Sequence, residues 1–416
     1  MIESSSSTSS STPQTSTDES SSDKDQETVS QHHNKRLQKM MNLMLPQMLA
    51  VLLQPVGRRY IKCDREGSYR QIWKDYCAEN CTYPANYFHR RYRMRRELFL
   101  RILKDIEAYD EYIVQRKDCC GRLGCSSIQK ITVAVHILAY GLSVDHCDEY
   151  QKIGESTVIE SLKHFCEAVI ALYDGQYLRS PNEQDIACLL QEGEERGFVG
   201  MLGSLDCMHW EWKNCPTAWH GTHRSHHHKP TLILEAVASK DLWIWHAFFQ
   251  MSSSHNDVNV LDHSPLLNSL IHGRMPPVNY TMNGRQHTLG YYLSDGIYPQ
   301  WATMMQTITH PTTRKERLFA KKQEAVRKDV ERAFGILQIR WGITQGTVRY
   351  WKKDDICNVM KTCIILHNMI NEDEHDIDVE RRRPPPDETI SPLEYTRNPA
   401  ILVAHISSRL SKIHNI

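Results

Sequence analysis

The chain has 416 residues, and its 50 lysines and arginines balance its 50 aspartates and glutamates, so the net charge is zero when histidine is neutral. This length allows two or three domains with at least one sizeable core, and a zero net charge excludes a uniformly basic nucleic-acid binder. The average hides an asymmetry, because residues 1–34 contain six acids and one base, which leaves a net charge of +5 on the remainder. The sequence therefore predicts an acidic tail and a basic body.

No stretch of the sequence is predicted to enter a membrane. The most apolar early run, residues 40–53, is 14 residues long and contains Pro46, whereas a spanning helix needs about 20 apolar residues. More than thirty mostly polar residues come before this run, which argues against a secretory signal. The 13 cysteines are odd in number and scattered, which predicts reduced thiols in the cytosol or nucleus rather than a disulfide framework.

Four regions are predicted in chain order. Residues 4–30 consist mostly of Ser, Thr, Asp, Glu and Gln, and such a composition cannot bury enough apolar surface to fold. The predicted regions are a disordered tail at 1–37, an all-α and DNA-binding region at 38–180, a mixed α/β domain at 195–372, and a linker with a short helix near 398–411 in 373–416.

The helical region contains two features that suggest DNA contacts. Apolar residues at helical spacing predict a helix over 96–106. Just before it lies an arginine-rich run, which is either an exposed helix end or a phosphate-contacting patch. The candidate contacts in this run are Arg90, Arg91, Arg93, Arg95 and Arg96.

Residues 148–158 resemble a helix-turn-helix in layout. A second apolar helix at 128–140 ends at Gly141, and a short helix, a glycine turn and a Ser/Thr start to a longer helix follow. Thr157 and Glu160 fit a capping box for that longer helix. A helical hairpin without DNA contacts has the same pattern, so both interpretations stay open. The apolar stripe expected on the longer helix is Val158, Leu162, Phe165 and Val169.

After Pro181 the pattern changes to strands mixed with helices. Strands followed by covering helices indicate a mixed α/β domain with both sheet faces covered. The expected strands are 198–205, ending at Asp206, the hairpin 231–238 and 242–251 around a turn at 239–241, and 289–293; the expected helices are 256–271 and 315–340.

Three acids stand at positions where they can meet. Asp206 and Asp295 end predicted strands, and Glu331 borders the buried stripe of the long helix. Clustered carboxylates repel unless a cation neutralises them, and hard oxygen donors suit Mg²⁺ or Mn²⁺. Two such ions about 3.5–4 Å apart can activate a water and stabilise the leaving oxygen of a phosphodiester. The competing interpretation is that these are ordinary strand-end and surface acids.

The long helix that contains Glu331 is strongly basic. Residues 314–340 contain nine bases and four acids, and such a helix draws a polyanion towards the proposed site. A solvated charged face explains the charge but not its placement beside the acids. The candidate DNA contacts on this helix are Lys321, Lys322, Arg327 and Lys328.

Several sequence blocks around these acids resemble the PIF/Harbinger DDE transposases, in particular the plant-type branch. The resemblance runs in order over roughly residues 85–373. The matching blocks are GMLGSLDCMHWEWKNCPTAW from Gly200, LEAVASKDLWIWHAFF from Leu234, NDVNVL from Asn256, LSDGIYP from Leu293, VERAFG from Val330 and ILHNM from Ile365.

This resemblance implies an RNase H-like fold and a catalytic triad of Asp206, Asp295 and Glu331 that binds Mg²⁺ or Mn²⁺. It implies a nuclear enzyme that cuts transposon ends and joins the freed 3′-hydroxyl to target DNA, with Asp257 in a further motif near the site. It also implies DNA contacts from the helical region 85–175 and help from a separately encoded Myb-like partner. A homo-oligomer is left open.

The chain also departs from that family at one loop. Five histidines lie between His220 and His228, where the family usually has a loop with glycine and acids. A variable surface loop is the expected explanation, since no matching second ligand cluster follows. The cysteines at 77, 81, 119, 120 and 125 lack the spacing of a zinc knuckle. The alternative function is that of a host-recruited, catalytically silent relative that acts as a DNA- or chromatin-binding adaptor.

Overall fold

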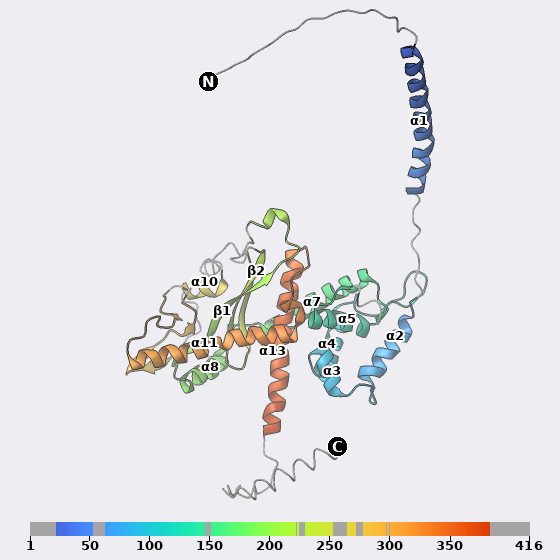
Figure 1. The fold of residues 1–416 in the computed structure, drawn as a ribbon. Helices are drawn as coiled ribbons and strands as arrows, with labels where there is room; N and C mark the ends of the chain where they lie inside the picture. Colours follow the sequence, from blue (N-terminus) through green and yellow to red (C-terminus); the bar gives the residue numbers. More distant parts are fainter. Residues whose placement is uncertain are drawn as a thin grey trace, which may run out of the picture. The chain divides into compact units, whose positions relative to one another are not determined.

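A computed structural model shows a small helical unit and a large mixed unit (Figure 1). It describes residues 22–52, 63–144, 146, 151–221, 223, 229–252, 264–271, 278–296, 298 and 300–382. The first compact unit comprises Met1–Lys62 and the second Cys63–Ile416. Among the described residues, no helix is long and apolar enough to cross a membrane.

The described part of the first unit is helix α1, Ser22–Leu52. This helix differs from the predicted disordered tail, which extended to residue 37. Asp23 and Asp25 lie in its first turn, where negative charge favours the positive end of the helix dipole. An apolar segment then follows within the same helix, and its side chains from Leu37 to Met48 are exposed.

The helical part of the second unit confirms the helices predicted in it. Its helices are α2 (Arg65–Ile72), α3 (Ala85–Tyr92), α4 (Arg96–Tyr109), α5 (Ser127–Tyr140), α7 (Glu155–Tyr177) and α8 (Glu183–Glu195), with a π-helical turn at Trp73–Cys77. The predicted stripe of Val158, Leu162, Phe165 and Val169 is buried.

The capping box predicted at Thr157 and Glu160 is wrong. Helix α7 begins three residues earlier than that cap implies, with Gly154 as N-cap and no side-chain cap. Capping boxes occur instead at Ser126 with Gln129 on α5 and at Asn182 with Asp185 on α8. Most of the first helix of the predicted helix-turn-helix, residues 147–150, lies outside the described residues.

A five-stranded mixed sheet forms the second half of the large unit, which confirms the α/β class. The strand order is β3-β2-β1-β6-β7. Strands β3, β2 and β1 pair antiparallel with one another, whereas β6 is parallel to both β1 and β7. The strands are β1 (Met201–Glu211), β2 (Thr231–Ala238), β3 (Ile244–Ser252), β6 (Tyr291–Leu293) and β7 (Met304–Met305), and a separate hairpin comprises β4 (Tyr280–Met282) and β5 (Arg285–His287).

Strand β1 is longer than predicted, and this changes the position of Asp206. The strand continues to Glu211, which pairs with Thr231 of β2. Trp210 is buried on the same face of β1 as Asp206, so burial keeps the strand regular beyond the acid. Asp206 therefore lies inside β1 and not at its end.

Four further helices follow in the described part of the chain: α10 (Pro265–Ile271), α11 (Arg314–Arg340), α12 (Gly342–Gln345) and α13 (Lys353–Arg382). Of these, α11 and α13 pack against the strands of the sheet. Helix α11 confirms the predicted basic helix, and α10 matches the end of the predicted helix 256–271, whose first part lies outside the described residues. Helix α13 continues to Arg382, through ten residues of the stretch predicted to be a linker. The predicted C-terminal helix near 398–411 lies outside the described residues.

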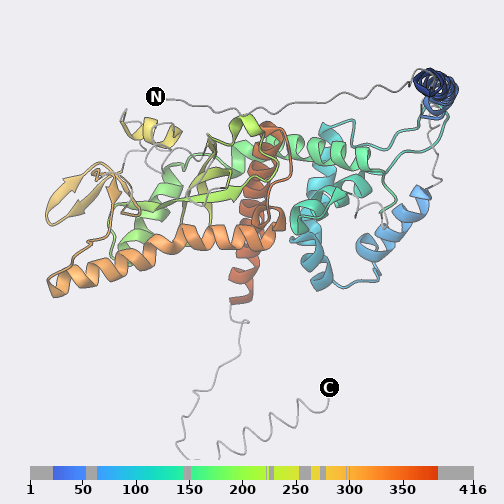
Figure 2. The same cartoon turned by 45° about the horizontal axis from the view of Figure 1, so that its top comes forward.

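Helix α13 joins the sheet to the helical part (Figure 2). One core cluster includes Phe165 of α7, Leu234 of β2 and Ile365 of α13. A second cluster on the other sheet face includes Leu205 of β1 and Ile186 of α8. The helical part and one face of the sheet thus share a continuous core.

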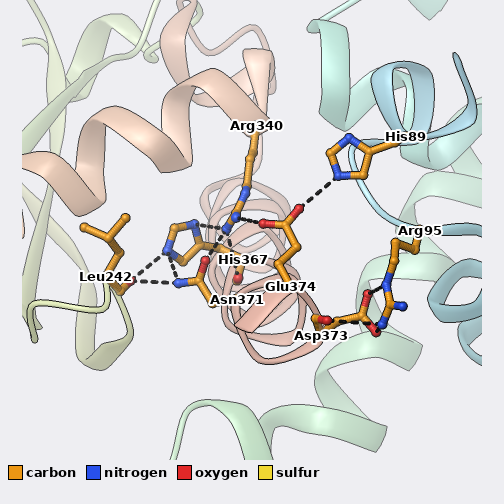
Figure 3. Close-up of polar contacts among 8 residues, drawn as sticks. All are labelled: His89, Arg95, Leu242, Arg340, His367, Asn371, Asp373 and Glu374. Atoms are coloured by element: carbon orange, nitrogen blue, oxygen red, sulfur yellow. Dashed lines mark hydrogen bonds and ion pairs between the residues drawn. The ribbon is translucent and has the colours of Figure 1, made fainter. Parts of the chain in front are cut away.

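Polar contacts along α13 reinforce this junction (Figure 3). Arg340, at the end of α11, donates to Glu374 at 2.7 Å and to Asn371 at 2.6 Å. The other Glu374 oxygen lies 2.9 Å from His89 of α3. Arg95, the residue before α4, forms an ion pair with Asp373. Asp373 and Glu374 of α13 are therefore bound by charged partners from α11 and from the helical part.

Candidate active site

Asp206 faces the side of the sheet that α11 covers. It pairs across the sheet with Ala236 of β2, and both lie on the face that packs against Val330 and Phe334 of α11. Its side chain is 22% exposed, and one oxygen accepts a hydrogen bond of 2.8 Å from the Cys207 N–H. The sheet thus holds this carboxylate in a mostly buried position next to α11.

Asp295 lies beside Asp206 because of the strand register. Strand β6 is parallel to β1, and Ser204 pairs with Leu293. Asp206 and Asp295 each follow this pair by two residues, so the two acids lie at the same level on neighbouring chains. The Asp295 carboxylate accepts a 2.6 Å hydrogen bond from the Gly296 N–H.

Helix α11 supplies the third acid. Its buried stripe includes the predicted Val326, Val330, Phe334 and Leu337, and Glu331 lies next to this stripe with a side chain that is 42% exposed. Hydrogen bonds from two polar side chains hold the helix near the site. The buried Gln323 donates to the carbonyl groups of Ser294 and Met305, at 3.2 and 3.1 Å. Ser204 donates to the Val326 carbonyl at 3.0 Å.

Arg327 connects the three acids. Its Nη1 atom lies 2.8 Å from Glu331 Oε1 and 3.8 Å from Asp206 Oδ2. The Asp295 carboxylate also acts on this guanidinium electrostatically. Arg327 is 11% exposed, and its Nη2 atom donates to Glu324 at 3.0 Å. The structure therefore places Asp206, Asp295 and Glu331 around one internal cation.

The acids influence one another's ionisation. Burial raises the pKa of Asp206 to about 6. The Cys207 N–H and the Arg327 guanidinium oppose that rise in the pKa, whereas the carboxylates of Glu331 and Asp295 add to it. Asp206 is therefore coupled to both other acids, and its negative charge is costly to maintain.

The donor chemistry of these three residues suits a hard divalent cation. Carboxylate oxygens are the donors that Mg²⁺ and Mn²⁺ prefer, and the acids already require a compensating positive charge. In the described part of the chain, no three His, Cys, Asp or Glu side chains lie close enough together to hold a metal ion. The positive group that the structure shows among the acids is Arg327.

The predicted DNA contacts on α11 fall into two groups. Lys321, Lys322 and Lys328 are exposed, although Lys328 lies 3.5 Å from Glu324. Arg327, by contrast, is directed into the acid cluster and has its charge compensated there. The helix therefore presents lysines to solvent beside the site and an arginine inside it.

The arginine-rich run at 90–96 is largely engaged within the protein. Arg91 lies over the Tyr83 ring at 4.2 Å, and Arg93 lies over the Tyr140 ring at 5.2 Å. Arg95 pairs with Asp373. Arg96 donates to the Cys81 sulfur at 2.8 Å and lies over the Phe88 ring. Arg90 is exposed. The rings that these arginines contact belong to Tyr83, Phe88 and Tyr140, which all lie outside the run.

The histidine loop is described in part. His223 is 6% exposed, its ring lies 5.3 Å from that of Trp212, and its Nδ1 atom lies 3.1 Å from the Trp219 carbonyl oxygen. His220 lies 2.9 Å from the Cys215 carbonyl oxygen. These two histidines therefore pack the loop against the end of β1. Residues 224–228 and Asp257 lie outside the described residues.

The block ILHNM from Ile365, which was singled out only by its resemblance to the family, has a clear structural role. Asn368 of the block from Ile365 accepts a hydrogen bond from the Ile244 N–H at 3.0 Å and donates to the carbonyl groups of Ile244 and Tyr177, at 2.8 and 2.7 Å. His367 lies 2.9 Å from the Leu242 carbonyl oxygen. The motif thus ties α13 to the start of β3 and the end of α7.

Comparison with known families gives a match over the region that contains these acids. Residues 175–378 match the family model described as plant transposon protein. Residues 69–107, in the helical part, match a domain of unknown function, DUF8418. Searches of curated proteins and of solved structures gave no match. The first match supports a transposase-related family for the sheet, α11 and α13.

Proposed function

We propose that this chain is a metal-dependent DNA endonuclease and transposase of the PIF/Harbinger DDE type, with an RNase H-like catalytic domain. The observation that carries the proposal is the position of Asp206 and Glu331 next to Arg327, with Asp295 at the level of Asp206 on the neighbouring chain segment. These acids come from one strand, the segment after another strand, and a helix. The match of residues 175–378 to a plant transposon family adds independent support.

In this proposal Asp206 and Asp295 would hold divalent ions, Mg²⁺ or Mn²⁺, and Glu331 would complete the ligand set. Bound ions of this kind lower the pKa of an attacking water and stabilise the leaving oxygen. The protein positions the acids through the β1–β6 register and through Gln323, which fixes α11. No covalent protein–DNA intermediate is needed, because water attacks first and the freed 3′-hydroxyl then attacks target DNA.

The DNA backbone approaches along α11. Lys321, Lys322 and Lys328 are exposed on the helix that carries Glu331, and exposed lysines attract phosphates in a salt-dependent way. Arg90 is the remaining exposed candidate of the arginine run. A DNA substrate implies a nuclear location, and a Myb-like partner can supply recognition of the transposon ends.

The test is nicking of supercoiled plasmid DNA by the full-length chain with Mg²⁺ or Mn²⁺. Wild-type protein is expected to nick, and Asp206→Asn, Asp295→Asn and Glu331→Gln are each expected to lose at least about 100-fold in rate. Asp354→Asn is the matched control, because Asp354 is an exposed acid at the start of α13. An inactive wild type, or nicking that survives Asp206→Asn, contradicts the proposal.

The second candidate function is a silent DNA- or chromatin-binding adaptor. The observation that favours it is Arg327, which already neutralises the acids in place of a metal ion. Titration of the protein with Mn²⁺ by calorimetry separates the two functions. Binding that disappears in Asp295→Ala supports the nuclease, whereas no binding to wild-type protein supports the adaptor.

A further inference from the structure

A second concave site lies away from the acid cluster, between α8 and the turn that joins β2 to β3. The cavity has a volume of about 290 Å³, which is at the lower end of the range of about 300–1,000 Å³ for drug-sized ligands. The space suits one long side chain better than a nucleotide. Its walls combine aromatic rings with acids: Trp243, Trp245, Asp185, Glu192, Asp241 and Glu372.

Two tryptophans form the apolar wall. Trp243 and Trp245 lie on either side of Ile244, whose side chain is buried in the core. Both indoles line the cavity, and Trp243 also packs against the core cluster that contains Ile244. Their ring centroids are 5.6 Å apart with a 40° tilt. The Trp245 indole N–H donates to the Ser239 hydroxyl at 2.9 Å, so this ring is held in place without a ligand.

Acidic residues outnumber basic residues in the cavity lining around the two tryptophans. Arg179 is the one base in the lining, and it is paired with Asp185. Glu372 accepts a 2.6 Å hydrogen bond from the Tyr177 hydroxyl. Asp241 accepts bonds from the Ser239 hydroxyl and from the Trp243 N–H. Among the described residues, these donors to Glu372 and Asp241 are neutral, so neither of these two carboxylates forms an ion pair at the cavity.

Glu192, another acid of the lining, also lies in a negative electrostatic potential. Burial raises the pKa of Glu192, and the Asp241 carboxylate raises it further, although Arg196, which lies 3.4 Å away, and Lys240 oppose the rise. A site with excess negative charge repels phosphate groups, so this cavity is not part of a DNA path. Tryptophan faces and carboxylates together attract a cation that has an apolar stem.

We infer that this cavity binds a lysine or arginine side chain from an exposed basic segment of a partner protein. The stem of that side chain packs on Trp243 and Trp245, and its charged head pairs with Asp241 and Glu372. The site is independent of the proposed nuclease activity, because none of its residues belongs to the Asp206, Asp295 and Glu331 cluster. Its function is recognition of a basic peptide.

The experiment uses the full-length chain labelled with ¹⁵N at its tryptophan indoles, and short peptides of the form acetyl-Gly-X-Gly-amide. X is lysine, trimethyl-lysine, arginine or, as the neutral control, glutamine. Nine tryptophans are present, and Trp243→Phe and Trp245→Phe assign the two signals of the cavity. The cationic peptides are expected to shift these two signals, and glutamine is not. The cation that binds most tightly identifies the partner residue.

Charge variants give the decisive comparison. Asp241→Asn and Glu372→Gln are expected to weaken peptide binding at least about fivefold each, since each removes a carboxylate from the site. Glu194→Gln is the matched control, because Glu194 is an exposed acid on α8 outside the cavity. Equal binding of the glutamine peptide, unchanged binding by both charge variants, or shifts of the same signals by a thymidine oligonucleotide would each overturn the inference.

Discussion

Arg327 and Glu331 form an ion pair of 2.8 Å one turn apart on α11, and the same arginine nitrogen lies 3.8 Å from Asp206. A guanidinium that is 11% exposed thus supplies positive charge beside these acids. A buried cation in a carboxylate cluster competes electrostatically with an incoming metal ion.

The first prediction follows from this competition. Arg327→Gln is expected to raise Mn²⁺ affinity at least about tenfold, or ~1.4 kcal/mol, because the acids lose their internal cation. Lys328→Gln is the matched control: it removes the same charge from the next residue, which is exposed and pairs with Glu324 instead. Calorimetric titration with Mn²⁺ measures both. Equal affinities for Arg327→Gln and wild type contradict a competing role for Arg327.

The second prediction concerns stability. Burial raises the pKa of Asp206 to about 6 from 3.8, so the folded state holds its proton more tightly than the unfolded state. The charged form therefore destabilises the fold fully above about pH 6, and this cost fades as the pH falls to about 4. Asp206→Asn is expected to increase the free energy of unfolding at pH 7 by about 1–3 kcal/mol.

Urea unfolding at pH 7 and pH 4 checks this expectation. The stabilising effect of Asp206→Asn should be present at pH 7 and nearly absent at pH 4. Asp354→Asn, at an exposed position of α13, should change the free energy of unfolding by less than about 0.5 kcal/mol at either pH. A destabilised Asp206→Asn protein at pH 7 would show that Arg327 more than offsets the burial of this acid.

The regular elements near the site were predictable because their sequence periods are strong. Strand β2 has the predicted bounds Thr231–Ala238, and α11 begins and ends within one residue of the predicted 315–340. The stripe from Val326 to Leu337 was visible at helical spacing. Asp295 follows strand β6 and Glu331 borders the buried stripe of α11, as predicted, whereas Asp206 lies inside β1 and not at the predicted strand end.

Other features depend on contacts that no local pattern contains. The Arg327 side chain is directed inward by Asp206 and Asp295, which lie 121 and 32 residues earlier in the chain. The helical periodicity of α11 does not indicate these interactions. The arginine run at 90–96 was judged as surface charge, but Asp373 and the ring of Tyr140 come from distant segments. The length of β1 was set by its pairing with β2 beyond Asp206.

The third prediction is a loss of stability in acid. His367 is buried and His136 is half-buried, and desolvation by the surrounding protein lowers their pKa values to about 3 and about 4. Each is neutral in the folded state but takes up a proton in the unfolded state below about pH 6.5. The free energy of unfolding should therefore fall as the pH drops from about 6.5 towards 4, by up to ~1.4 kcal/mol per pH unit for each histidine.

Urea unfolding between pH 7 and pH 5 measures this slope. His367→Gln and His136→Gln should each reduce the slope by up to one proton, and the double variant should reduce it by the sum. The variants will also lower stability at pH 7, since both sites are packed, but the slope separates titration from packing. An unchanged slope in both single variants would assign the acid sensitivity to other groups.

The fourth prediction concerns the junction at the end of α13 (Figure 3). Arg340 is 15% exposed at its side chain and pairs with Glu374, which also contacts His89 of the helical part. Arg340→Gln leaves Glu374 without its main cation, and removal of one partner from a mostly buried ion pair costs about 3–5 kcal/mol. Because the remaining exposure and His89 reduce this cost, the expected loss in unfolding free energy is about 2–3 kcal/mol. Arg314→Gln, at the exposed start of the same helix, should change it by less than about 0.5 kcal/mol. Chemical denaturation of the two variants gives the comparison, and equal losses would mean that the junction owes its stability to the shared apolar core alone.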